Sequence, residues 1–543
     1  MRAIDLYAGI GGWSLGLRLA GVDMVASYEW WQPAIDTHNG NHGGDLKPVD
    51  IRKLALSDLP SDIDLVVGSP PCTEFSYSNR GGSGDIVEGM KDLVKFLEVV
   101  EHLKPRWWAF ENVPRVAEVL RRGLADAKHA LYRFRHLAPH IEVVDFSDYG
   151  APQSRKRCIA GNIPFDLIHA YRDRLPGRTL GDVVRALAAA DEVVDPVWGV
   201  RLPATELTET EAEAALNPEE LRMNREAKLF HPVYNNMAFP DRLDQPARTV
   251  TATCTRVSRE SIVIADPRAK GRFRRLTIRE RACLQGFPIT YQFYARSFAE
   301  KAKMVGNAIP PTFTHLVALA AQGIRPEGLD GFAEAGRQLR LPEKVATVTR
   351  PDTEGRSYPA KRGFRAAVPG LRFKSGMRFD LSNEVGADST DWRVRFFFGP
   401  SKDVREVDLD GSTWSELRRE LAGPEFASFR SRLVKAEQEL GLSSPQALQD
   451  RWTHRAEGLG PYEVVDLLGS LAGHLVEVLG KQMEADPGPV RAFVRQRAET
   501  APGRGPTPGL AKVEKYAVEV LAGLIVGDWF NGLSWHAARR AAA

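Results

Sequence analysis

The chain has 543 residues, which is too long for one ordinary domain and predicts about three. Its formal net charge is +3, with 73 Lys and Arg against 70 Asp and Glu, so the overall charge neither indicates nor excludes nucleic-acid binding, which needs only a local basic patch. The four cysteines, Cys72, Cys158, Cys254 and Cys283, form no CxxC pair, which argues against a zinc site and a disulfide framework and fits a reducing cytosol.

The first predicted element is a short apolar strand at 3–7, so no signal peptide is expected before it. It runs into Ala8, Gly9, Ile10, Gly11 and Gly12, a glycine-rich turn that opens an amphipathic helix. Glycine lets a backbone approach a ligand closely, and a helix N-terminus offers unpaired N–H groups. The turn therefore predicts a ligand site, although its spacing is not the GxGxxG of dinucleotide-binding loops.

Acidic residues follow the next strand and the loop after it. The second predicted strand, 24–28, ends at Glu29 and Trp30, and Asp50 and Ile51 come after a loop. An acidic residue at the end of a second strand can accept hydrogen bonds from ribose hydroxyls. Each acid is equally compatible with a helix cap or a solvated carboxylate.

A cysteine is held on a rigid turn after the next predicted strand. The apolar run at 63–67 leads into Gly68, Ser69, Pro70, Pro71 and Cys72. The two prolines restrict the backbone, and the carboxyl ends of strands in open α/β sheets are where ligands bind. The polar, glycine-rich segment 79–85 has the composition of a mobile loop. The cysteine is thus placed like a nucleophile, although a free cysteine alone is more often a small buried apolar residue.

Two later strand boundaries carry charged side chains. A predicted strand at 106–110 ends at Glu111, Asn112 and Val113, and a strand at 141–146 precedes a basic cluster at 153–157 that contains Arg155 and Arg157. Arginines at such a boundary can grip phosphates or polar base edges, although a solvated surface would have the same composition.

These motifs resemble those of the DNA cytosine-5 methyltransferases. The resemblance rests on DLYAGIGG at 5–12, with Tyr7 where phenylalanine is usual, and on Glu29-Trp30, Asp50-Ile51, Pro70-Pro71-Cys72 and Glu111-Asn112-Val113. It continues with QSRKR at 153–157, LTIRE at 276–280, LQGFP at 284–288 and VGNAIPP at 305–311, and so covers about the first 325 residues. Thr73 departs from the glutamine of many bacterial members.

The resemblance implies an α/β fold, a Rossmann-like class I S-adenosylmethionine-dependent methyltransferase sheet with a smaller target-recognition domain. The resemblance does not cover the chain beyond this, where the sequence pattern predicts a mostly helical C-terminal extension. The expected boundaries are 1–165 for the first part of the catalytic domain, 166–299 for the target-recognition domain, and 300–327 for the return to the catalytic domain. A linker is expected at 328–363 and an α-rich accessory domain of unknown role at 364–543, with one strand at 391–399.

The resemblance also implies the roles of the site residues. Cys72 would attack C6 of cytosine, Glu111 would protonate or hydrogen-bond N3, and Arg155 and Arg157 would hold the base and a neighbouring phosphate. S-adenosylmethionine is the implied methyl donor and no metal is expected. The residues implied to bind the methyl donor are Tyr7, Ala8, Gly9, Gly11, Gly12, Glu29, Trp30, Asp50, Ile51, Pro71 and Asn307.

The implied function is methylation of C5 of a cytosine that is flipped out of double-stranded DNA, as the modification component of a bacterial restriction-modification or antiviral defence system. A cytoplasmic, nucleoid-associated protein is expected, with no membrane segment and with a protein partner for the C-terminal domain. The alternatives are a catalytically idle DNA-binding regulator and an RNA cytosine-5 methyltransferase. Donors expected to read DNA lie at Arg222, Arg225, Lys228, His231, Tyr234, Asn235, Asn236, Arg242 and Arg248.

Overall fold

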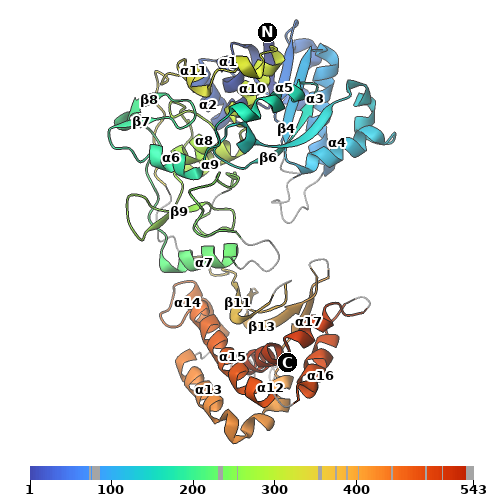
Figure 1. The fold of residues 1–543 in the computed structure, drawn as a ribbon, viewed down its shortest axis with the longest axis vertical. Coiled ribbons are helices and arrows are strands. Elements are labelled where there is room, and N and C mark those ends of the chain that lie inside the picture. Colours follow the sequence, from blue (N-terminus) through green and yellow to red (C-terminus); the bar gives the residue numbers. More distant parts are fainter. Residues whose placement is uncertain are drawn as a thin grey trace. The chain divides into compact units, whose positions relative to one another are not determined.

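The computed structural model describes residues 1–71, 75, 86–229, 237–253, 255–351, 358–373, 376–386, 389–400, 403–441, 444–483, 486–503 and 506–533. The described chain forms two compact units (Figure 1). Unit 1 contains residues 1–229 and 237–354, and unit 2 begins after residue 354. Within the part of the chain that is described, no helix is both long and apolar enough to span a bilayer.

Unit 1 is built on a six-stranded mixed sheet with the order β2-β1-β3-β4-β6-β5. The strands are β1 (Arg2–Leu6), β2 (Asp23–Tyr28), β3 (Leu65–Gly68), β4 (Trp107–Asn112), β5 (His140–Asp145) and β6 (Lys156–Gly161). Strands β1 to β4 are parallel, and β6 runs antiparallel to both β4 and β5. The beginning of β6 therefore lies at the same edge of the sheet as the carboxyl ends of the other strands.

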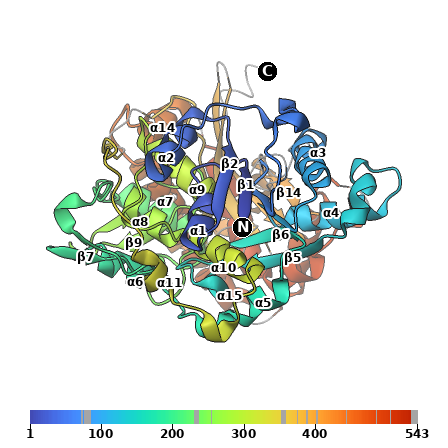
Figure 2. The same cartoon turned by 90° about the horizontal axis from the view of Figure 1, so that it is seen from above.

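Alternation along the strands places two apolar cores on opposite faces of this sheet. One core contains Ile4, Val66, Trp108 and Phe110, which pack under α3 and α4. The other contains Ala3, Leu65, Val67 and Ala109, which pack under α1 and α10 (Figure 2). The helices are α1 (Gly12–Leu19), α2 (Gln32–His42), α3 (Ile86–Leu103), α4 (Arg115–Ala125), α5 (Phe165–Ala170) and α10 (Pro311–Ala321). The α/β arrangement expected from the sequence, an open and mostly parallel sheet with helices on both faces, is thus confirmed.

The contact between α1 and α10 depends on two glycines. A Cβ atom on Gly12 would overlap the backbone of Ile309, and one on Gly16 would overlap Thr314 and the carbonyl of Pro311. The Thr314 hydroxyl donates to the Gly12 carbonyl at 2.9 Å. Residues around 310 are therefore held against the loop that follows β1.

The remainder of unit 1 consists of short elements whose apolar residues extend the core and which also bury several ion pairs. They are α6 (Leu180–Ala186), β7 (Glu192–Val194), β8 (Arg201–Pro203), α7 (Pro218–Leu229), β9 (Val263–Ala265), β10 (Phe273–Arg275), α8 (Ile278–Leu284), α9 (Phe298–Asn307) and α11 (Phe332–Gly336). The buried face of α7 is polar, because Glu220 pairs with Arg256 and Asn224 donates to the Arg256 carbonyl at 2.8 Å.

Part of the segment expected to be a linker packs on unit 1. Phe332, Leu339 and Ala346 are buried, and Lys301 donates to the Glu209 carboxylate and to the Thr347 carbonyl, each at 2.6 Å. The segment is rich in Arg, Pro and Gly, which predicted a linker. Its apolar residues, which are spaced along the segment, are nevertheless buried in the core of unit 1. The unit boundary lies at residue 354 rather than near 328.

Unit 2 combines helices with a four-stranded antiparallel sheet of order β11-β12-β13-β14. The strands are β11 (Arg365–Arg372), β12 (Arg378–Val385), β13 (Thr390–Phe398) and β14 (Arg405–Asp408). The helices are α12 (Ser412–Leu417), α13 (Ala427–Leu440), α14 (Pro445–Trp452), α15 (Pro461–Met483), α16 (Gly488–Glu499), α17 (Leu510–Lys515) and α18 (Ala517–Asn531).

Helices α15 and α18 pack on one face of this sheet. The sequence indicated only the strand corresponding to β13. The strands β12 and β14 were missed because charged residues alternate with the apolar ones, and β11 was missed because Pro369 and Gly370 interrupt its apolar run. Arg378, for example, is buried through its ion pair with Asp380 at 2.9 Å.

The Lys301–Glu209 pair provides a test of how the segment after α11 is held. Both residues are buried, so Lys301→Met would leave an uncompensated carboxylate and should lower the unfolding free energy of unit 1 by about 3–5 kcal/mol. Urea unfolding followed by tryptophan fluorescence measures the change. Arg337→Met, which removes an exposed pair with Glu334, is the matched control and should change stability by less than about 1 kcal/mol. Equal effects of the two substitutions would contradict the structural role assigned to Lys301.

Candidate active site

The loop between β1 and α1 is held open by residues in the left-handed region of backbone space. Tyr7, Gly9 and Gly11 have φ values of 57°, 55° and 85°. Gly11 is the N-cap of α1, and a Cβ atom there would collide with the rings of His38 and His42. The loop can therefore present backbone N–H groups at a helix N-terminus, the arrangement that binds polar ligand groups.

Glu29 joins this loop to the end of β2. Its carboxylate accepts from the backbone N–H groups of Gly9 at 2.8 Å, and of Trp30 and Trp31 at 2.9 Å each. The side chain is buried, so these bonds fix it beside the glycine loop. The sequence placed Glu29 at this edge, and the structure adds that three backbone donors hold it there.

A cavity of about 380 Å³ lies at this edge of the sheet. Its lining includes Tyr7, Trp30, Asp50, Ile51 and Pro71, five of the residues that the sequence implied for the methyl donor. The Trp30 side chain is 68% exposed, which leaves a large ring free to stack on a ligand. The lining combines aromatic and apolar side chains with the charged Asp50, Arg52, Glu88 and Asp92. Rings and apolar surface beside carboxylate acceptors suit an adenosine group, so the residues present fit S-adenosylmethionine.

The other expected cofactor residues are near this cavity without lining it. Ala8 donates its N–H to the Tyr28 carbonyl at 3.0 Å, which places the loop across the end of β2. Asn307 is exposed at the end of α9, two residues before Ile309, whose backbone faces Gly12.

A buried polar network lies behind the loop between β1 and α1, and it was not predicted from the sequence. Asp5 in β1 is fully buried and accepts from the Ser14 hydroxyl at 2.8 Å, and His38 lies 3.2 Å from the same hydroxyl. Burial raises the pKa of Asp5 to about 8 and lowers the pKa of His38 to about 4. Both groups are thus neutral near pH 7. The available signal was a carboxylate within an otherwise apolar strand.

Glu111 and Arg157 form an ion pair at the same edge of the sheet. The Glu111 Oε1 atom lies 2.9 Å from Arg157 Nε, and both side chains are largely buried. They meet because Glu111 ends β4 while Arg157 begins the antiparallel β6. The Asn112 amide donates to the Pro70 carbonyl at 3.0 Å, which fixes the turn after β3 beside Glu111. Cys72, the expected nucleophile, lies outside the described residues.

Arg155 is placed differently from the expectation. It is buried and its guanidinium donates to the carbonyls of Val250 at 3.0 Å and Gly306 at 2.9 Å. Gln153 makes similar contacts, accepting from the Val250 N–H at 2.9 Å. Arg155 therefore ties the start of β6 to two distant backbone segments, whereas the expected contact with a base or phosphate would need an accessible guanidinium.

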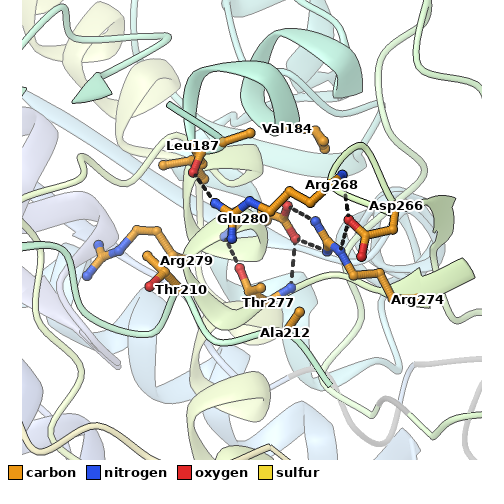
Figure 3. Close-up of a pocket in the computed structure, with 11 residues that line it drawn as sticks. Val184, Leu187, Thr210, Ala212, Asp266, Arg268, Arg274, Thr277, Arg279 and Glu280 are labelled. Atoms are coloured by element: carbon orange, nitrogen blue, oxygen red, sulfur yellow. Dashed lines mark hydrogen bonds and ion pairs between the residues drawn. The ribbon is translucent and has the colours of Figure 1, made fainter. Parts of the chain in front are cut away.

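The later motif residues around α8 also act as scaffold (Figure 3). Thr277 and Glu280 form a capping box at the start of α8, and Glu280 makes a two-bond ion pair with Arg274 at 2.8 Å per bond. These side chains surround a cavity of about 30 Å³, which has room for only a few water molecules. This space is too small for a substrate, so the motif organises the fold here.

Several of the expected DNA-reading donors are engaged within the protein. Lys228 is buried and donates to Asn224 at 2.8 Å, and Arg248 pairs with Asp241. Arg242 is exposed and makes a two-bond pair with Asp244. Arg222 is half-buried and Arg225 is exposed on α7. The remaining candidates at 231 and 234–236 lie outside the described residues, and within the described ones no cluster of His, Cys, Asp or Glu could hold a metal ion.

Comparisons with known proteins place this site in a family. The family model described as C-5 cytosine-specific DNA methylase matches residues 1–322. The chain is 26% identical over 338 residues to the type II methyltransferase M.FnuDI of Fusobacterium nucleatum, covering 59% of this chain and 93% of the relative. It is 28% identical over 328 residues to M.HindV of Haemophilus influenzae, covering 59% and 96%. Among solved structures, Dnmt2 of S. pombe shares 18% identity, with 60% of this chain and 99% of that chain covered and a TM-score of 0.41.

The buried carboxyl of Asp5 predicts a specific pH dependence of stability. Its pKa is about 8 in the folded state against an ordinary value of 3.8 for aspartate, so between about pH 4 and 8 the unfolded chain is ionised at this group while the folded chain keeps the proton. The folded state binds more protons, and this group's contribution to stability therefore falls as the pH rises through that window. Asp5→Asn cannot ionise and should remove a slope of at most about 1.4 kcal/mol per pH unit.

Melting temperatures of wild type and Asp5→Asn between pH 4 and 9 measure this effect, and exposed Asp173→Asn is the control that should keep the wild-type slope. Parallel melting profiles for wild type and Asp5→Asn would show that Asp5 does not hold its proton in the folded state.

Proposed function

Because the chain belongs to the C-5 cytosine-specific DNA methylase family and is a DNA cytosine-5 methyltransferase, we propose that it acts through a covalent bond between Cys72 and C6 of a flipped-out cytosine. The observation that carries the proposal is the Glu111–Arg157 pair beside the Pro70–Pro71 turn. This pair shares the sheet edge with the cavity that suits the methyl donor.

The cavity residues would hold S-adenosylmethionine through its adenosine group. The Trp30 and Tyr7 rings and Ile51 offer apolar surface, and Asp50 offers an acceptor at the rim. The glycine loop is itself held at this edge, because the Gly9 N–H donates to Glu29 at 2.8 Å and the Gly11 N–H donates to the Ala8 carbonyl at 2.9 Å. When bound, this donor supplies a methyl group on a cationic sulfur, which becomes a neutral thioether once C5 has taken the methyl.

The chain's own groups activate the base. The Cys72 thiolate adds its electron pair to C6, which forms the S–C6 bond and shifts the ring's electrons toward C5 and N3. Glu111 donates a proton or hydrogen bond at N3 and so stabilises the charge that develops there. After C5 carries the methyl, loss of the C5 proton returns an electron pair to the ring and breaks the S–C6 bond, which releases the thiolate.

Arg157 and Arg155 take separate roles in this proposal. Arg157 orients the Glu111 carboxylate through their ion pair and is placed to contact the base. Arg155 is a positioning residue, because its buried guanidinium ties the start of β6 to Val250 and Gly306. The Gly306 contact also holds the chain that returns to the glycine loop.

Methylation of C5 within a duplex requires the base to leave the stack, because the faces of C5 and C6 are covered by neighbouring base pairs. We assign base flipping and target recognition to the region at 166–299, with residues 1–165 and 300–327 forming the catalytic domain. The exposed Arg225 on α7 is a described donor available for DNA.

The cellular role proposed is DNA modification within a bacterial restriction-modification or antiviral defence system. The relatives named above are type II methyltransferases, and their matches cover about three fifths of this chain. Unit 2 lies beyond the matched family model and is proposed to bind a protein partner.

Methyl transfer from labelled S-adenosylmethionine to duplex DNA tests the mechanism. Wild type should produce 5-methylcytosine in one sequence context, and Cys72→Ser should lose transfer because a hydroxyl is a far weaker nucleophile. Glu111→Gln should lower kcat by about 10²- to 10⁴-fold. Sequencing maps the modified base, and cofactor binding measured separately shows that each variant is folded. If the protein binds the cofactor but methylates only RNA, the substrate is RNA rather than DNA. If it binds DNA but not the cofactor, the protein is a DNA-binding regulator rather than an enzyme.

Substitutions of Arg157 and Arg155 should have different effects, the first on kcat and the second on stability. Arg157→Lys breaks the contact to Glu111 and should lower kcat by at least about tenfold while the melting temperature stays close to that of wild type. Arg155→Lys loses part of a buried fork and should lower the unfolding free energy by about 1–3 kcal/mol, with a smaller effect on kcat of the folded enzyme. Transfer kinetics and urea unfolding on both variants check this, and the reverse pattern would exchange the two roles.

A further inference from the structure

One ion-pair cluster in the cofactor cavity has no part in the mechanism above. It is centred on Asp92 in α3, whose carboxylate is buried. The Arg52 guanidinium grips this carboxylate with two bonds, Nε to Oδ1 at 2.9 Å and Nη2 to Oδ2 at 2.6 Å. A two-bond contact of this kind fixes orientation as well as distance.

Tyr7 contacts the same carboxylate from the glycine loop. Its hydroxyl lies 3.2 Å from Asp92 Oδ1. Burial first, and then the negative charge of Asp92, raise the pKa of Tyr7, so the hydroxyl keeps its proton and remains a donor. The contact is notable because Tyr7 has a φ of 57°, a backbone conformation that a bulky side chain seldom adopts without support.

Arg52 reaches a second acid of α3. It pairs with the Glu88 carboxylate and also donates to the Glu88 carbonyl at 3.2 Å. These bonds connect α3 to the short 3-10 helix η1 (Ile51–Lys53), which follows directly after Asp50. Attachment to Asp92 gives the largest contribution to the raised pKa of Arg52, so the cation persists at any working pH.

The three segments joined at Asp92 are three walls of the cavity. Tyr7 comes from the loop after β1, Asp50 to Arg52 from the segment around η1, and Glu88 to Asp92 from the first turns of α3. Moving any one of these contacts would therefore change the width of the cavity between the Tyr7 ring and Ile51. Phenylalanine, the residue usual at the position of Tyr7 in the family, could not make the hydroxyl contact.

We propose that Asp92, through Arg52 and the Tyr7 hydroxyl, is a positioning residue that sets the width of the cavity for the cofactor's adenosine group. The inference rests on the proposed function, since it concerns the same cavity. It predicts that the cluster governs cofactor affinity and leaves the chemical step nearly unchanged, because none of its members lies at the Glu111–Arg157 pair.

Tyr7→Phe and Arg52→Met test this through direct binding. Calorimetry with S-adenosylhomocysteine, the demethylated cofactor, reports affinity without turnover. Loss of one hydrogen bond should raise Kd about three- to tenfold for Tyr7→Phe. Loss of the charged fork should raise Kd about tenfold or more for Arg52→Met. KM for S-adenosylmethionine should rise in parallel, with kcat within about twofold of wild type.

A double-mutant cycle and a matched control separate positioning from general stability. Because both side chains act on one carboxylate, Tyr7→Phe should cost less in the Arg52→Met background than in wild type. Lys95→Met removes another link between α3 and the same segment, the bond from Lys95 Nζ to the Leu54 carbonyl at 2.6 Å, which does not line the cavity. It should leave Kd unchanged.

An unchanged Kd in Tyr7→Phe, or an equal rise in Lys95→Met, would overturn the inference even if Arg52→Met failed to fold. Failure of the proposed function is distinguishable, since wild type itself would then fail to bind the cofactor or to transfer a methyl group.

Discussion

The antiparallel direction of β6 is the constraint on which the site depends. Parallel strands bring only their carboxyl ends to one edge of a sheet, but a single reversed strand brings its beginning there as well. Because β6 lies between β4 and β5, Arg157 at its start reaches Glu111 at the end of β4. The turn at Pro70 then joins the same edge through Asn112. Residues separated by more than 40 positions in the chain thus meet at one edge.

The sequence predicted the frame of unit 1 well, for physical reasons. Its strands are short apolar runs that end at glycine, proline or a charged residue. Strands of this kind are readily recognised from the local sequence alone. The cavity residues Tyr7, Trp30 and Pro71 could be placed for the same reason, since strand ends of a parallel sheet share an edge. What the residues do at that edge followed from the family resemblance rather than from periodicity.

The misplaced expectations concern partners that are distant in sequence. Nothing near Arg155 in the chain reveals that the carbonyls of Val250 and Gly306 lie within its reach. Likewise Arg52 and Asp92 sit in separate elements, and only the folded chain shows that they share a cavity wall. In unit 2, strands that contain buried ion pairs such as Arg378–Asp380 have a polar sequence and were therefore not recognised as strands. The prolines and charges of the segment after residue 328 predicted a linker. Its apolar residues Phe332 and Leu339 are instead buried and pack in the core of unit 1.

The glycine contact between α1 and α10 also orders events during synthesis. The loop after β1 is translated first, yet its backing at Ile309 and Thr314 is made some 300 residues later. A nascent chain emerging from the ribosome therefore carries this loop without its packing partner until α10 has left the exit tunnel. The first helix of the fold gains its final contacts only when nearly all of unit 1 has emerged.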